Sequence, residues 1–246
     1  MNKFLLVLFV VFIKSATAKL PSVIKVCSRN DPNIDACIKN SLESLRQNLA
    51  SGNFGENFNV PKIEPLYFES IKMQRGQEFQ AAFSRLNIFG CSGFELEKLH
   101  ADPKNLTFDI QVLLPKLNFT GKYSLKMKIL LLNLAGKGDI KGQLTKSRAN
   151  LRVRGYTETI DGEDFVRFHR MSIKLKIDDG KFQLSNLFNG DPVLGQVGNQ
   201  VINDNARLFI DELTPGLEKN LSKIFSEIIN NILKDSTHND MFPDKV

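Results

Sequence analysis

The stretch that decides the fold is KYSLKMKILL, residues 122–131. Its odd-numbered residues are apolar from Tyr123 to Leu131, and residues 122, 124, 126 and 128 are polar. A period of two is typical of a β-strand with one buried and one solvated face. The same alternation recurs in residues 106–114 and 171–178. Turn-forming residues separate these runs at 120–121, 136–138, 161–162 and 179–180. Residues 66–184 are therefore predicted to form a long antiparallel meander.

Helical spacing of the apolar residues returns on both sides of this meander. Residues 33–50 are predicted to form an amphipathic helix that Asp31 or Asn33 caps. Residues 198–234 are predicted to form a second helix, about 50 Å long. Because Pro215 lacks a backbone donor, a kink or break is expected in this helix near Thr214.

The sequence offers no further element that could cover so long a helix. The predicted fold class is therefore α+β: a long curved antiparallel β-sheet wraps around the long C-terminal helix, with an N-terminal helix beside it. No repeat or linker interrupts the chain, so residues 19–246 are expected to form one domain. The chain has 19 Phe, 3 Tyr and no Trp, and stiff rings are hard to pack along such a roll. An elongated apolar tunnel is expected between sheet and helix.

Alternation in the strands and spacing in the helices nominate the side chains that line this tunnel. They are Leu42, Leu45, Phe108, Ile110, Tyr123, Leu125, Met127, Ile129, Ile173, Leu175, Leu213, Leu217, Ile224 and Ile228. Ordinary core packing would turn the same side chains inward, so the pattern leaves both roles open. Tyr123 differs from the rest because an inward phenol can hydrogen-bond an ester, carboxylate or carbonyl on an apolar guest.

The N-terminus has the features of a secretory signal peptide. Lys3 precedes an apolar run over residues 4–13, and Ala16-Thr17-Ala18 matches the small-x-small cleavage pattern. Residues 1–18 are therefore expected to be removed, and the mature protein is expected to be secreted and soluble.

The cysteines agree with an oxidising environment. Cys27 and Cys37 flank a turn-prone segment and are expected to pair, a link worth about 3 kcal/mol in the chain-entropy model. Cys91 is left over, either as a buried inert thiol or as a partner for another chain. Three sequons offer candidate glycosylation sites at Asn105, Asn118 and Asn220.

Positive charge is concentrated in one part of the chain. The formal net charge is +6, and residues 116–154 hold ten basic side chains against one acid, Asp139. A solvated sheet face and a surface that docks on anionic membranes both fit this pattern. Nucleic acid is not expected as a partner of a secreted chain.

Nothing in the sequence favours catalysis. The three histidines, His100, His169 and His238, are scattered and lack metal-ligand spacing. Residues 90–94 fall short of a nucleophile elbow, and the carboxylates of residues 161–164 surround a turn. No enzyme activity, metal or cofactor is expected.

Several motifs in order carry a family resemblance. They are VCSRNDPNIDACIKNS (26–41), PKIEPL (61–66), GCSGF (90–94), LPKLNFTGKY (114–123), NLFNG (186–190), NDN (203–205) and LTP (213–215). Together they resemble the insect takeout and haemolymph juvenile-hormone-binding protein family over essentially the whole mature chain.

This resemblance implies a curved sheet around a long C-terminal helix with an apolar tunnel, related in shape to tubular lipid-binding modules. It also implies a secreted carrier of terpenoid, fatty-acid-like or quinone-like lipids, with chemosensory, circadian or feeding-related roles. The family's N-terminal cysteine pair corresponds to Cys27 and Cys37. The hormone carriers have a second, later disulfide, and no cysteine follows Cys91 here, so the takeout-like branch is expected.

The expected function is therefore that of a monomeric, secreted carrier for an apolar small molecule. Two alternatives stay open at this point. One is a lipid-transfer protein that docks its basic sheet face on anionic membranes. The other is an extracellular signalling partner whose cavity is only structural.

Overall fold

A computed structural model of the chain describes residues 20–56, 58 and 60–245. The predicted signal peptide, residues 1–18, lies outside the described residues. The helices are α1 (Ile34–Ser44), α2 (Arg46–Ser51), α3 (Pro192–Asp204), α4 (Ala206–Ile232) and α5 (His238–Met241). The strands are β1 (Leu66–Arg75), β2 (Phe79–Phe89), β3 (Glu95–Asp102), β4 (Thr107–Ile129), β5 (Leu132–Ile160), β6 (Glu163–Phe168) and β7 (Ser172–Leu184). Two short 3₁₀ turns, Cys91–Gly93 and Phe188–Gly190, complete the order.

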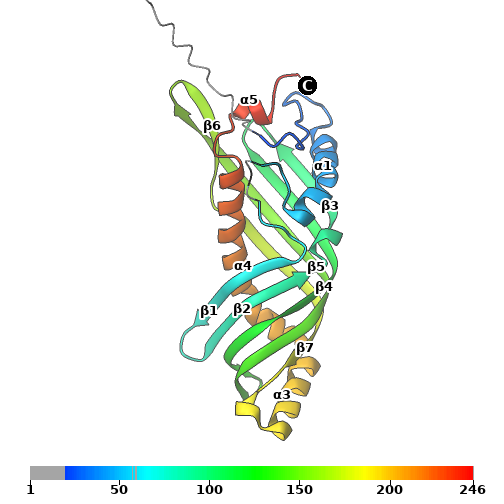
Figure 1. Cartoon of the computed structure of the whole chain (residues 1–246), viewed down its shortest axis with the longest axis vertical. Coiled ribbons are helices and arrows are strands. Elements are labelled where there is room, and N and C mark those ends of the chain that lie inside the picture. Colours follow the sequence, from blue (N-terminus) through cyan, green and yellow to red (C-terminus); the bar gives the residue numbers. More distant parts are fainter. Residues whose placement is uncertain (1–19, 57, 59, 246) are drawn as a thin grey trace, which may run out of the picture.

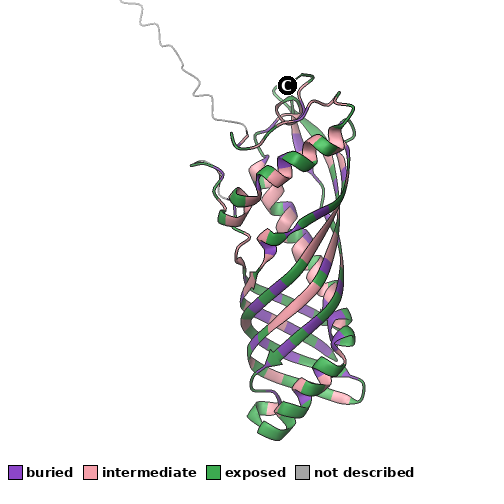
Figure 2. Cartoon of the chain, turned by 90° about the vertical axis from the view of Figure 1, so that its right-hand side faces the viewer, coloured by how far each residue is buried: buried purple, intermediate pink, exposed green. Residues whose placement is uncertain are grey.

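The strands form one antiparallel sheet that curls around α4, as the sequence predicted (Figure 1). The main path is β1-β2-β4-β5-β6, with β3 paired to β4 and β7 paired to β5. The two longest strands, β4 and β5, run most of the length of the molecule. They pair without a break in register from Ile129↔Leu132 to Thr120↔Lys141, which fixes the alternation of faces in the lower half. Figure 2 shows buried and exposed residues alternating along these strands.

Three of the four predicted turns are wrong, since residues 120–121, 136–138 and 179–180 lie inside strands. Only residues 161–162 form a turn, between β5 and β6. Leu131 was expected to face inward but lies exposed in the turn between β4 and β5. The glycines that resembled turn markers make room for close packing instead. A Cβ at Gly121 would lie 3.1 Å from the Cα of Leu86, and one at Gly136 would lie 2.6 Å from the Tyr123 hydroxyl oxygen.

Both predicted helices are divided, at Leu45 and at Asn205. The side chain of Asn205 donates to the carbonyl of Val201 at 2.9 Å, and such local bonding competes with helix continuation. Of the expected kink or break near Thr214, the break is wrong, because α4 continues through Pro215. Pro215 is exposed, so water can satisfy the carbonyl that the missing donor leaves free.

The buried apolar side chains fall into three clusters. The largest lies between the lower half of the sheet, α3 and the first half of α4. A second lies between the upper half of the sheet and the C-terminal half of α4. A small third cluster is built on Leu45, Phe54 and Val60, close to α1 and α2. The fold therefore places α4 against the concave face of the sheet over its whole length (Figure 1).

Candidate ligand-binding site

The edge of the sheet at β7 is held by side chains of the last long helices. Asn203 of α3 accepts a hydrogen bond from the N–H of Phe182 and donates to its carbonyl, at 2.9 and 2.8 Å. Asn199 does the same with Leu184, at 2.8 and 2.9 Å. These amide groups take the place of a neighbouring strand and protect an edge that would otherwise be open. We call this line of contact between α3–α4 and β6–β7 the seam.

The seam has a gap in its middle. Towards the C-terminus of α4, Asn230 pairs with both backbone groups of Phe168, and Glu218 accepts from the N–H of Leu175 at 2.9 Å. Within the described part of the chain, no side chain of α3 or α4 bonds the backbone of residues 176–181. Side chains of α3 thus bond the sheet edge on one side of this gap and side chains of α4 on the other, with none within it.

An apolar cavity of about 90 Å³ lies between the sheet and the part of α4 that faces the gap. Its walls come from β2, β4, β5, β7 and α4. They are formed by Phe83, Leu86, Ile88, Phe119, Ile140, Leu144, Ile177, Phe182, Phe209, Ile210, Leu213 and Leu217. Since no side chain in the wall carries a hydrogen-bonding group, the cavity favours uncharged, apolar molecules and disfavours water.

Aromatic rings connect the helix to the sheet at this cavity. The ring of Phe182 on β7 meets that of Phe209 on α4 edge-on, with 4.8 Å between the centroids. On its other side Phe182 contacts Phe119 of β4, at 6.0 Å. Rings in this arrangement attract one another beyond the effect of burial, so they hold α4 to the sheet at the border of the gap.

Tyr123 does not present a free hydroxyl to the cavity. Its hydroxyl donates to the backbone carbonyl of Ser185 at 2.7 Å. Burial raises the pKa of the Tyr123 phenol to about 12, so the group is neutral at physiological pH. The sequence suggested that this phenol serves a polar group of a guest; in the structure its one donor hydrogen is engaged by the backbone.

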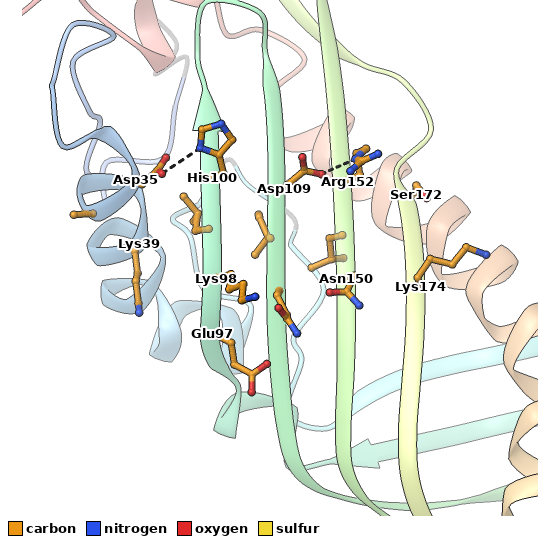
Figure 3. A pocket seen from close by; sticks show the side chains of 15 residues that line it. Asp35, Lys39, Glu97, Lys98, His100, Asp109, Asn150, Arg152, Ser172 and Lys174 are labelled. Carbon is orange, nitrogen blue, oxygen red and sulfur yellow. Dashed lines mark hydrogen bonds and ion pairs between the residues drawn. The ribbon is translucent and has the colours of Figure 1, made fainter.

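A larger, polar groove of about 930 Å³ lies on the outside of the sheet, between α1 and strands β3, β4, β5 and β7 (Figure 3). Two pairs of its charged side chains interact with one another. His100 Nδ1 lies 3.3 Å from Asp35, and Arg152 Nε lies 2.6 Å from Asp109. These four paired side chains are largely exposed to solvent, whereas the polar groups of a specific site are typically desolvated.

The basic outer face of β4 and β5 is neutralised in part. Besides Arg152, Arg148 pairs with Glu97 and Asp178. Lys122 pairs with Asp139, the one acid of the basic stretch. In the described ranges, no three or more His, Cys, Asp or Glu side chains gather where they could hold a metal ion. No helix of those ranges is long and apolar enough to cross a membrane.

Comparison with known proteins shows to which family the chain belongs. A family model described as "Haemolymph juvenile hormone binding protein (JHBP)" matches residues 5–243. The chain belongs to the haemolymph juvenile hormone binding protein family. The family resemblance inferred from the sequence motifs is confirmed.

Relatives and a solved structure extend this result. The circadian clock-controlled protein daywake of Drosophila melanogaster is 23% identical over 238 residues, which cover 92% of this chain and 90% of the relative. Daywake of Drosophila yakuba is 22% identical over the same coverage. The crystal structure of Epiphyas postvittana Takeout 1 matches with a TM-score of 0.73 and 22% identity, over 89% of this chain and 99% of the other. This likeness confirms the predicted α+β fold, a curved antiparallel sheet with the long C-terminal helix and an N-terminal helix. It does not test the elongated tunnel that the sequence predicted, and in its place the structure has the apolar cavity of about 90 Å³.

The fold of the juvenile hormone binding protein family distributes the predicted lining residues over several places. Leu213 and Leu217 line the cavity. Five others belong to the same cluster outside the cavity wall: Tyr123, Leu125, Met127, Ile129 and Ile224. Four lie in the upper cluster: Phe108, Ile110, Ile173 and Leu175. Leu45 lies in the third cluster, and Leu42 and Ile228 are half-buried.

The sequence analysis did not predict ten of the residues that line the cavity. Strand β2 illustrates the reason. Phe79, Ala81 and Phe83 are buried at odd positions, but the next buried residue is Leu86. A bulge between Ser84 and Asn87 shifts the register and exchanges the inward and outward positions. The period of two is therefore interrupted where the cavity begins, and the positive φ of 48° at Arg85 gives no clear sequence signature.

Two of the three cysteines form a disulfide, and the third is a buried free thiol. Cys27 and Cys37 form a disulfide that ties the N-terminal arm to α1. Cys91 is buried, and burial together with the Glu64 carboxylate raises the pKa of its thiol to about 12.

The candidate glycosylation sites Asn105 and Asn118 are exposed. The third, Asn220, is half-buried, and its side-chain amide donates to the carbonyl of Gly216 at 2.8 Å. This bond competes with attachment of a glycan to the same nitrogen.

Proposed function

We propose that this protein is a non-enzymatic carrier that shields an apolar small molecule from extracellular water. The observation that carries the proposal is the cavity between α4 and the sheet, whose wall consists of hydrocarbon side chains only. Membership of a family described as hormone-binding supports it. We further propose that the chain is secreted after removal of residues 1–18 and acts as a monomer, in keeping with the Cys27–Cys37 disulfide.

The volume of the cavity restricts the size of the guest molecule that can enter without a change in the wall. Its volume of about 90 Å³ is well below the ~300–1,000 Å³ typical of ligand pockets. A terpenoid or fatty-acid-like guest must therefore displace part of the wall. The gap in the seam is the place where this costs least, because no side-chain hydrogen bond of α3 or α4 to residues 176–181 has to break there. Asn203 and Glu218 on either side keep the rest of the helix in register.

The cavity wall also restricts the charge and polarity of the guest molecule. Burying an ionised carboxylate without a partner costs several kcal/mol, and no lining side chain can pair with one. We therefore propose a neutral guest, such as a terpenoid ester or a long-chain alcohol, in preference to an ionised fatty acid. Affinity then comes from apolar area at roughly 25 cal/mol per Å².

The test is a cavity-filling substitution with a matched control. Leu217 lines the cavity, whereas Leu66 packs on the same cluster outside its wall, and both are partly buried. With the fluorescent probe N-phenyl-1-naphthylamine, Leu217→Phe is expected to weaken binding about tenfold. Leu66→Phe is expected to leave it within about twofold. Equal affinity of the two variants, or no probe binding by the unmodified protein, would refute a guest at this place. Mass spectrometry of a solvent extract from the purified protein then identifies the guest.

A further inference from the structure

One end of the molecule exposes large apolar side chains. In the turn between β4 and β5, Leu131 is 92% exposed and Leu130 is 61% exposed. On α3, Val193 is 69%, Leu194 48% and Val197 45% exposed. The spacing of the α3 residues puts them on one side of the helix. We call these five side chains the apolar tip.

The two parts of the apolar tip belong to the same end of the structure. Gly136, near the start of β5, bridges to Leu187 just before α3. A Cβ at Gly198 of α3 would lie 3.6 Å from Leu134 Cδ2, so helix and hairpin pack together. Figure 1 shows α3 at the lower end of the long axis, opposite α5 and the C-terminus. In Figure 2 this helix is drawn mostly as exposed.

Lysines surround the hairpin part of the apolar tip. Residues 123–138 contain Lys126, Lys128 and Lys137 and no acidic residue, and all three lysines are exposed. At about 3.3 Å per residue, Lys126 and Lys128 lie within roughly 13 Å of the turn. Asp191 directly precedes the α3 part, and its carboxylate is engaged by the N–H groups of Val193 and Leu194.

At the other end of the molecule, the turn between β5 and β6 is acidic. The turn between β5 and β6 carries Asp161, Glu163 and Asp164 around an exposed Ile160. An anionic surface therefore attracts the lysines beside the apolar tip and repels this acidic turn, which favours an approach with the apolar tip towards that surface.

We infer that the apolar tip inserts into the surface of an anionic lipid bilayer, with Lys126 and Lys128 on the headgroups. Apolar insertion and basic attraction are each weak alone, and their combination is what stable peripheral binding requires. A second copy of the chain is a poorer occupant, because a two-fold contact would set these lysines against their own copies. This inference goes beyond the carrier function and does not depend on it.

The test is flotation with vesicles of phosphatidylcholine containing 30% phosphatidylserine, and with pure phosphatidylcholine. The unmodified protein is expected to float with the anionic vesicles at least tenfold more than with the neutral ones. Leu131→Ser, and more strongly Leu131→Ser with Val193→Ser, is expected to reduce the bound fraction at least fivefold. The matched control is Ile160→Ser, next to the turn at the far end, which is expected to bind normally.

Three results would overturn the inference. They are no flotation with anionic vesicles, equal flotation of the Leu131 and Ile160 variants, and sedimentation showing that the apolar tip instead mediates self-association. Because all substituted side chains are exposed, far-ultraviolet circular dichroism should confirm an unchanged fold. Probe binding in the cavity should be unaffected, so failure here is distinguishable from failure of the carrier proposal.

Discussion

The side-chain amide of Asn230 pairs with both backbone groups of Phe168, accepting from its N–H and donating to its carbonyl at 2.9 Å each. A helix side chain here completes the edge of a β-sheet. The same arrangement at Asn199 and Asn203 repeats it at the other end of the seam. The register of α3 and α4 along the sheet is therefore set by hydrogen bonds of defined geometry as well as by apolar packing.

The first prediction concerns this pairing. Asn230→Asp replaces the amide donor with a carboxylate oxygen, which faces the Phe168 carbonyl and leaves that carbonyl unpaired. Urea unfolding is expected to show a loss of about 2 kcal/mol. Asn231→Asp is the control, since residue 231 is exposed and the charge change is identical. Its free energy of unfolding should stay within about 0.5 kcal/mol of the unmodified protein. Equal losses in both variants would mean that the seam bonds contribute nothing.

The second prediction concerns the glycines inside the long strands. A Cβ at Gly142 would lie 2.3 Å from the Lys181 carbonyl oxygen and 2.5 Å from the Phe119 ring. Gly142→Ala is expected to cost about 1–3 kcal/mol, because backbone cannot move aside as a side chain can. Gly195→Ala in α3 has its nearest contact at 3.8 Å and should stabilise the protein by up to about 1 kcal/mol. Guanidinium unfolding of both variants checks the contrast, and a neutral Gly142→Ala would contradict it.

How far the sequence could predict this structure depends on the element. The alternation around Tyr123, Leu125 and Met127 was enough to identify the inward face of β4, because both neighbouring strands pair with it regularly there. The glycines led to wrong turn predictions. In the sequence alone, a glycine that avoids a clash with a neighbouring strand cannot be distinguished from a glycine that forms a turn. The asparagines of the seam were missed because, in sequence, Asn199 and Asn203 resemble an ordinary solvated helix face.

The third prediction follows from Glu64. Burial alone would raise the pKa of this carboxyl, but hydrogen bonds from Ser92 and Gly90 outweigh it and hold the pKa below its usual value. A lowered folded-state pKa stabilises the protein above the unfolded-state pKa of about 4.3, and that stabilisation is lost as pH falls through the folded-state pKa. Glu64→Gln should therefore cost about 1 kcal/mol at pH 7. The difference between variant and unmodified protein should shrink below about pH 4. A difference that is constant between pH 3 and pH 7 would exclude this origin.

The fourth prediction tests the polarity of the guest. Because the cavity wall offers no partner for a charge, a long-chain methyl ester is expected to bind at least about tenfold tighter than the matching free acid at pH 7.5. Lowering the pH protonates the acid, and the neutral form enters the cavity without the cost of desolvating a charge. The affinity of the acid should therefore rise towards that of the ester as pH falls towards the usual carboxyl pKa of about 4.3.

The matching long-chain alcohol is the control for that experiment, since its affinity should not change with pH. Displacement of a bound fluorescent probe between pH 5 and pH 8 measures all three guests under conditions in which Glu64 stays ionised. An acid that binds as tightly as its ester at pH 7.5 would require a cationic partner, and none of the cavity-lining side chains can supply one. That result would place the guest's head group outside the cavity, at the surface of the seam.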